Sequence, residues 1–106
     1  MASRTARAYS ITEVEVLDPE GFSRYREIAQ AAIAKYGGRF LVQGAEPRVA
    51  EGEWPSQRRV VIIEFASMRQ LQSWYDSPEY APARAIARRA LKRRLLLVEG
   101  VPRPAP

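Results

Sequence analysis

The chain has 106 residues, of which 46% are hydrophobic and 27% charged, a composition that suits one compact domain. It contains no cysteine and no histidine. That excludes disulfides, thiol nucleophiles, thiolate and imidazole metal ligands, and the usual general base. We expect neither a metal nor a cofactor, and any acid–base chemistry would have to use Asp, Glu, Tyr, Lys or a bound cofactor.

The net charge of +5 is concentrated in one segment. Six basic residues and no acidic residue lie between Ala83 and Val98, whereas the rest of the chain is close to neutral. No apolar stretch approaches the roughly 20 residues of a membrane span, and residues 1–7 have no apolar continuation that would make them a secretory signal. We expect a cytoplasmic protein that does not contact a membrane.

The first strand and the first helix are predicted from residues 8–36. Residues 8–17 indicate a strand because alternate side chains fall on opposite faces. Asp18 can accept a hydrogen bond from a free backbone N–H and Pro19 suits the first turn, so a helix begins there. Apolar residues recur at helical spacing as far as Tyr36, and Gly37 suits the left-handed conformation that ends a helix.

The next predicted strand covers residues 39–43. Its alternation places Phe40 and Val42 toward the helices and Gln43 on the opposite face. After a turn, residues 48–51 are predicted to continue as an edge strand, where a neighbouring proline is tolerated.

Residues 59–65 are predicted to form the central strand of the fold. The run from Val60 to Ile63 is unbroken and β-branched, which favours a strand buried on both faces. Glu64 is anomalous in this strand because a carboxylate is rarely buried without a partner.

Two short helices and a final strand complete the prediction. Ser67 and Gln70 form a capping-box pattern that begins one helix, and the segment around Ser77 and Pro78 ends it and begins another. The later helix has an apolar stripe at helical spacing, formed by Ala83, Ile86, Ala87, Ala90 and Leu91. Residues 95–98 are fully apolar and form the last predicted strand.

The predicted elements follow the order β-α-β-β-α-β, which is typical of the ferredoxin-like α+β fold. In that fold an antiparallel sheet carries its helices on one face. The other face would be bare in a monomer although its strands are apolar, so we expect a homodimer in which two sheets face each other. Residues 8–101 form the single predicted domain, and residues 1–7 and 102–106 are expected to be flexible ends.

Residues that match a known family are spread over nearly the whole chain. They are Ala8-Tyr9, Asp18-Pro19-Glu20, Tyr25, Gly37-Gly38-Arg39-Phe40-Leu41-Val42, Glu51-Gly52-Glu53-Trp54, Arg59-Val60-Val61-Ile62-Ile63-Glu64-Phe65-Ala66-Ser67, Trp74-Tyr75-Asp76-Ser77-Pro78-Glu79-Tyr80 and Val98-Glu99-Gly100. With these residues the chain resembles the domain-of-unknown-function family 1330, in the dimeric α/β-barrel superfamily. The resemblance implies a homodimer of ferredoxin-like subunits but no established reaction, because superfamily relatives include cofactor-free monooxygenases, isomerases and haem proteins. The lack of histidine argues against haem.

A polar cluster on the open face of the sheet is the first candidate site. The ferredoxin-like strand order would place Glu64 between Glu13 and Arg39 on the face away from the helices. One hypothesis is an ion pair between Glu64 and Arg39 that fixes strand register and dimer geometry. The other is a catalytic pair, in which Glu13 and Glu64 share one proton while Tyr9 and Arg39 bind a ligand.

Aromatic residues form the second candidate site. A ligand pocket would be lined by Trp54, Trp74, Tyr75 and Tyr80. The alternative is ordinary helix–sheet packing and loop anchoring, since aromatic side chains dominate protein cores. Tyr80 follows a helix cap, and its hydroxyl needs a hydrogen-bond partner.

The basic residues from Arg84 to Arg94 form the third candidate site. On a helix, Arg84, Arg88 and Lys92 would lie on one face, where they suit an acidic partner or nucleic acid or simply face solvent. Binding of nucleic acid is not expected, because no stacking aromatic follows Tyr80 in this helix. Two functional hypotheses therefore stand: a metal-free, sheet-associated pocket that binds or transforms a small molecule, and a basic interaction module.

Overall fold

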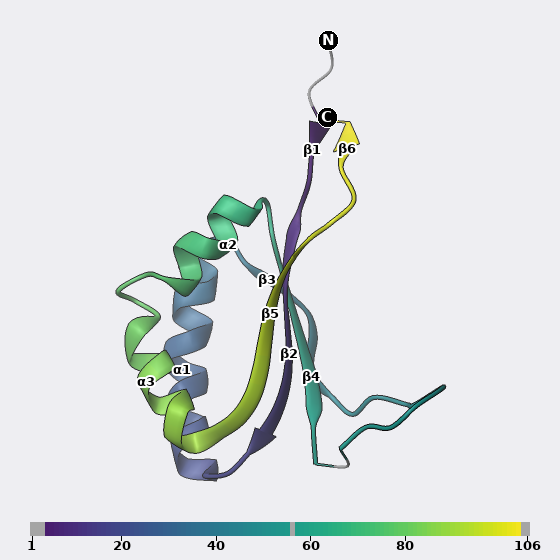
Figure 1. Ribbon diagram of the computed structural model, residues 1–106. Coiled ribbons are helices and arrows are strands. Elements are labelled where there is room, and N and C mark those ends of the chain that lie inside the picture. The colour runs from purple at the N-terminus through teal and green to yellow at the C-terminus, as the bar shows by residue number, and fades with distance from the viewer. Residues whose placement is uncertain (1–3, 56, 105–106) are drawn as a thin grey trace.

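Three helices cover one face of a four-stranded antiparallel sheet in the computed structural model, which describes residues 4–55 and 57–104 (Figure 1). The elements in chain order are β1 (Arg4–Thr5), β2 (Ala8–Val16), α1 (Pro19–Lys35), β3 (Arg39–Ala45), β4 (Arg59–Phe65), α2 (Met68–Tyr75), α3 (Ala81–Ala90), β5 (Leu91–Glu99) and β6 (Arg103–Pro104). The strand order of the large sheet is β3-β4-β2-β5. This arrangement confirms the predicted ferredoxin-like α+β fold.

The predicted helix ends are formed by local contacts. The backbone N–H of Glu20 donates to Asp18 Oδ1 at 3.2 Å at the start of α1. Gly37 follows that helix with a φ of 77°, a left-handed conformation that glycine adopts without strain. At the start of α2, the backbone N–H of Gln70 donates to Ser67 Oγ at 3.1 Å. Short-range sequence signals therefore place these boundaries correctly.

The core lies between the helices and the sheet, and aromatic rings fill its centre. Phe65 from β4 stacks on Trp74 from α2, with ring centroids 5.4 Å apart, and Tyr80 lies against the same indole at 4.4 Å. All three side chains are almost fully buried. Gly38 is needed beside them, because a Cβ at that position would lie 2.6 Å from the Phe65 ring. The strand after α1 can thus pass directly beneath this aromatic cluster.

The last strand begins four residues earlier than predicted, at Leu91, and α3 ends at Ala90. The carbonyl of Ala90 accepts hydrogen bonds from the backbone N–H groups of Leu17 and Asp18 at 2.8 and 3.1 Å, which hold the chain where it changes direction. Pairing with β2 then extends over the whole of β5. Three of the basic residues assigned to the third helix, Lys92, Arg93 and Arg94, consequently lie on a strand.

The edge strand β3 is irregular. Phe40 pairs with Ile63, but Val42 pairs with Ile62, so a bulge lies at Leu41. The bulge moves Val42 to the open face and Gln43 to the face beneath the helices, the reverse of the predicted alternation. A second irregularity falls at Gly44, whose φ is 79°.

Two further differences concern the loop after β3 and the chain ends. Residues 48–51, predicted as an edge strand, have no strand conformation. Arg4–Thr5 pairs antiparallel with Arg103–Pro104, and Figure 1 shows this ribbon extending beyond one end of the large sheet. The ribbon was not predicted, because its pairing joins residues at opposite ends of the chain.

Candidate functional site

A cavity of about 540 Å³ lies between α1 and the large sheet. All four strands of that sheet contribute to its walls, and α2 contributes Trp74. Many of its walls are apolar, formed by side chains such as Phe22, Ile33, Phe40 and Leu95. A partly apolar cavity of this size suits a small organic molecule.

Two residues that line the cavity each carry a buried polar atom with no hydrogen-bond partner among the described residues. They are Ser10, with Oγ, and Trp74, with Nε1. Both residues are only 1% exposed, so these two atoms are covered by protein and are not open to the cavity space.

A cationic cluster lies at the β5 side of the same cavity. Arg93 Nη1 donates to the hydroxyl oxygens of Tyr25, at 2.9 Å, and Tyr80, at 3.3 Å, and the two hydroxyls are hydrogen-bonded to each other at 2.7 Å. The guanidinium also lies over the Tyr25 ring, 5.3 Å from its centroid. Arg93 and Tyr25 line the cavity, and no described carboxylate forms an ion pair with Arg93.

The charge states of this cluster follow from its surroundings. Burial raises the pKa of Tyr80 well above its ordinary value, the neighbouring Tyr25 raises it further, and Arg93 offsets the rise only in part. Burial by itself lowers the pKa of Arg93, but its contacts with Tyr25 and Tyr80 outweigh that effect and raise the pKa overall. Tyr80 therefore stays a neutral hydroxyl beside a permanent cation, and the cluster can stabilise negative charge on an oxygen.

Exposed side chains mark the opening of the cavity. Arg26 on α1 and Arg59 on β4 lie among them, together with Gln57 from the loop before β4. Glu15 borders the cavity, but it alternates with Val14 on β2 and pairs with Lys92, so its side chain belongs to the open face of the sheet. With Arg93, three arginines thus line the cavity, and its electrostatic potential is positive.

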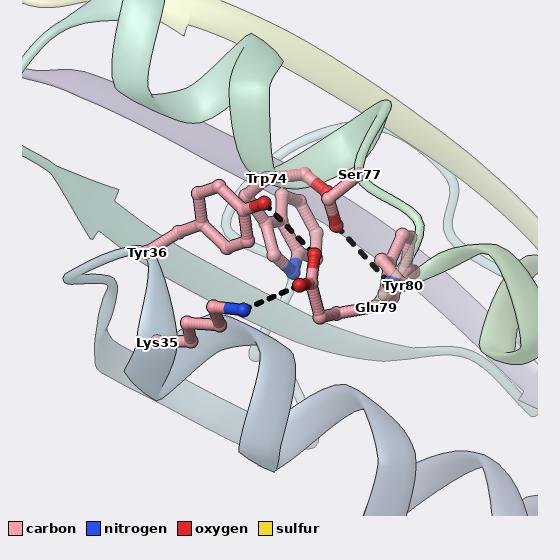
Figure 2. A network of polar contacts seen from close by, with 6 residues as sticks. All are labelled: Lys35, Tyr36, Trp74, Ser77, Glu79 and Tyr80. Atoms are coloured by element: carbon pink, nitrogen blue, oxygen red, sulfur yellow. Dashed lines mark hydrogen bonds and ion pairs between the residues drawn. The ribbon is translucent and has the colours of Figure 1, made fainter.

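The turn that carries Trp74 and Tyr80 is held by the polar network drawn in Figure 2. Ser77 Oγ donates to the Trp74 carbonyl at 2.8 Å and accepts from the Tyr80 backbone N–H at 3.1 Å. The carboxylate of Glu79 accepts from the Tyr36 hydroxyl at 2.8 Å and pairs with Lys35 at the end of α1. Hydrogen bonds from Lys35 and Tyr36 lower the pKa of Glu79 to about 2. This network joins the end of α1 to the segment between α2 and α3, next to Trp74 of the cavity wall.

Glu64 lies on the opposite face of the sheet from the cavity. It is 8% exposed and accepts a hydrogen bond from Arg39 Nη2 at 2.9 Å, so the predicted ion pair is present. The Tyr9 hydroxyl donates to the same carboxylate at 3.2 Å, and an Arg7 nitrogen lies 3.7 Å from it. Tyr9, Arg39 and Glu64 therefore form one cluster on the open face.

Glu13 is not part of that cluster, which corrects the predicted catalytic pair. Register pairs Tyr9 with Glu64, whereas Glu13 pairs with Val60. The four-residue offset along β2 corresponds to about 13 Å at roughly 3.3 Å per residue. Glu13 is bound instead by Arg94 and Arg58, and the hydrogen bond from Arg94 is the main cause of its lowered pKa. Glu13 and Glu64 are thus too far apart to share a proton.

The four predicted aromatic residues separate into three environments. Trp74 lines the cavity and Tyr80 contacts Arg93 behind it. Tyr75 packs beneath the Arg84 guanidinium, 5.4 Å from its ring centroid. Trp54 lies in the loop after β3, where its Nε1 donates to the Arg58 carbonyl at 3.2 Å, and it does not line the cavity. A ligand-binding role for Trp74 and Tyr80 stays a prediction.

Sequence reasoning missed Ser10, Tyr25 and Arg93 as site residues. Tyr25 was named only among the residues that match the family, and Arg93 was assigned to a basic helix face. A signal for Arg93 was present, because Leu91, Arg93 and Leu95 alternate with period two and share one face of a strand. Such an arginine on an inward face needs a specific role.

No group of three or more acidic residues that could hold a metal ion occurs within residues 4–55 and 57–104. In the same part of the chain, no helix is long and apolar enough to cross a membrane.

Comparisons with known proteins define the class and then the family. A protein of unknown function from Rhodopseudomonas palustris is 18% identical, with a TM-score of 0.73 over 92% of this chain and 85% of that chain. SnoaB, a cofactor-independent oxygenase from Streptomyces nogalater, is 16% identical, with a TM-score of 0.63 over 87% and 90%. A dimeric ferredoxin-like protein of unknown function from Thermobifida fusca is 16% identical, with a TM-score of 0.54 over 92% of both chains.

These likenesses define the ferredoxin-like fold. Residues 7–101 match the family described as domain of unknown function (DUF1330), and the chain belongs to that family. No curated protein matches the sequence.

Proposed function

We propose that the protein binds and transforms a small organic molecule in the cavity between α1 and the sheet, without a metal. The observation that carries this proposal is the cavity itself, with its apolar walls and with Arg93 and Tyr25 on its lining. Sites for small molecules are concave and mostly apolar, with a few polar groups that orient the ligand. The description of SnoaB as a cofactor-independent oxygenase supports metal-free chemistry on this fold.

The chemistry that suits the site is one in which a ligand oxygen gains negative charge. Arg93 and Tyr25 offer a cation and a hydroxyl at one place, and the apolar surroundings strengthen their electrostatic effect. Removal of a proton beside a carbonyl group, which produces an enolate, is a reaction of this kind, with solvent water as the proton acceptor.

We further propose that the working unit is a homodimer formed through the open face of the sheet. Leu96 is 57% and Val98 41% exposed on β5, next to Ile11 of β2 and Ile62 of β4. The ion pairs of Glu64 satisfy the charge on this face internally, so a second sheet can cover it without leaving an isolated carboxylate. The dimeric protein from Thermobifida fusca supports this arrangement.

The proposed function is tested with a variant in which a larger side chain fills part of the cavity. Ala29 is buried on its α1 wall, so Ala29→Leu places three extra carbon atoms inside, whereas Ala31→Leu adds them to an exposed position of the same helix. Protein purified from cells is denatured, and released small molecules are identified by mass spectrometry. We expect the same compound from the wild type and Ala31→Leu and none from Ala29→Leu.

If no compound co-purifies, a small-molecule library is screened by thermal shift on the same three proteins. A complete lack of stabilising compounds, or equal stabilisation of Ala29→Leu, contradicts the proposal. Circular dichroism confirms that both variants are folded before either comparison is made.

The alternative function as a basic interaction module stays a prediction. The structure distributes the basic residues over separate environments: Arg93 faces the cavity, Arg84 covers Tyr75, and Arg94 binds Glu13. This distribution favours the cavity over a continuous basic surface.

A further inference from the structure

We propose that the ligand of this cavity is an organic anion with an apolar body, whose charged oxygen binds Arg93 and Tyr25. The inference rests on the proposed function and adds the chemical class of the ligand. It follows from the charges of the lining, from the hydrogen bonds of the tyrosine pair and from the apolar walls.

The first argument is the uncompensated positive charge. Arg93 is partly buried, and its hydrogen-bond partners from side chains are two neutral hydroxyls. A cation withdrawn from water is strongly stabilised by an opposite charge, yet no ion pair of Arg93 is found within residues 4–55 and 57–104. Arg26 and Arg59 at the opening add to the positive potential, which attracts anions toward the interior.

The second argument concerns the proton of Tyr25. Either hydroxyl can be the donor in the bond between Tyr25 and Tyr80. Tyr80 is fully buried and does not line the cavity, so donation to Tyr25 is the arrangement that satisfies it. The Tyr25 hydroxyl then keeps its own proton for an atom in the cavity. Arg93 and Tyr25 thus present two donors to one ligand oxygen, a geometry that suits a carboxylate, enolate or phenolate.

The third argument defines the rest of the ligand. Phe40, Ile33 and Leu95 form apolar walls, which favour a hydrocarbon body. The ligand class is therefore an organic anion with an apolar body.

Isothermal titration calorimetry with three coumarins tests the proposal at low salt. Coumarin-3-carboxylate and 4-hydroxycoumarin are ionised at neutral pH, as a carboxylate and an enolate, whereas 4-methoxycoumarin is neutral; all three carry the lactone carbonyl. We expect at least one anion to bind tenfold or more tightly than 4-methoxycoumarin. The tighter of the two anions identifies whether the site prefers a carboxylate or an enolate.

Variants then test whether the preference for anions depends on Arg93 and Tyr25. Arg93→Gln should lower anion affinity at least tenfold, the loss of a charge-assisted hydrogen bond, and leave affinity for 4-methoxycoumarin within about twofold. Arg88→Gln makes the same charge change on the exposed surface of α3 and should alter neither. Tyr25→Phe should weaken the anions alone. If Arg93→Gln does not fold, Arg93→Lys retains the charge and should retain the preference.

Equal affinity for 4-methoxycoumarin and both anions overturns the inference, as does an unchanged preference in Arg93→Gln or an equal loss in Arg88→Gln. If a neutral probe binds and Ala29→Leu blocks it, or if the co-purified compound is neutral, the anion class is wrong while the proposed function stands. If neither a coumarin nor any other compound binds, both fail.

Discussion

Replacing Tyr80 with phenylalanine removes one hydroxyl from the cluster beside the cavity and leaves the ring packing unchanged. The ring is fully buried against Trp74, with centroids 4.4 Å apart, so its apolar contacts persist in the variant. The lost hydroxyl bonds to Tyr25 at 2.7 Å and to Arg93 at 3.3 Å. The experiment therefore isolates the hydrogen bonds from the hydrophobic packing.

The expected loss in the free energy of unfolding follows from the hydrogen bonds that Tyr25 and Arg93 retain in the variant. A buried hydrogen bond contributes about 1 kcal/mol net, and one to a charged group about 1.5–3 kcal/mol. Arg93 and Tyr25 still bond each other at 2.9 Å and face the cavity, so their remaining polar groups can bind water there. We expect the free energy of unfolding to fall by about 1–2 kcal/mol, which lowers Tm by roughly 4–8 °C per kcal/mol for a domain of about this size.

Urea denaturation followed by circular dichroism measures this difference, at several protein concentrations because the proposed dimer would make stability concentration-dependent. Tyr36→Phe is the control, since that hydroxyl bonds Glu79 nearer the surface and should matter less. If Tyr80→Phe equals or exceeds the wild type in stability, the hydroxyl cluster does not support the fold and its description as a stabilised network is wrong.

Leu96→Glu places a charge on the open sheet face, and we expect sedimentation to change from about twice 12.0 kDa to the monomer mass; an unchanged dimer would show that another surface is used. For Glu79, a folded pKa of about 2 against an ordinary 4.5 means that its stabilisation is complete above about pH 4.5 and is lost as pH falls toward 2. Glu79→Gln should therefore flatten the acid limb of a stability–pH curve measured by urea denaturation, and an unchanged slope would show that the Lys35 pairing contributes nothing.

Local signals made the helix boundaries predictable. Asp18, Gly37 and Ser67 act on backbone groups within a few residues of themselves, so sequence alone identifies their roles. The element order and the apolar runs then led to the ferredoxin-like sheet. The ion pair of Glu64 with Arg39 could also be predicted from the sequence, because the two residues occupy paired positions on neighbouring strands.

The cavity was not predictable, because it depends on contacts between distant segments. Alanine and arginine between Ala81 and Arg94 all favour a helix, and pairing with β2 is what converts Leu91–Glu99 into a strand. That conversion turns Arg93 toward Tyr25, 68 residues away in sequence. Likewise, a bulge at Leu41 reverses the faces of the residues after it, and simple alternation cannot anticipate a bulge.

The central strand β2 is shared between the two faces of the sheet. Ser10 faces the cavity, while its neighbours Tyr9 and Ile11 belong to the open face, where Tyr9 bonds Glu64. One layer of backbone thus separates a bound molecule from the surface proposed to meet a second subunit. Any substitution in β2 therefore changes the wall of the cavity or the open face, according to whether its position is even or odd.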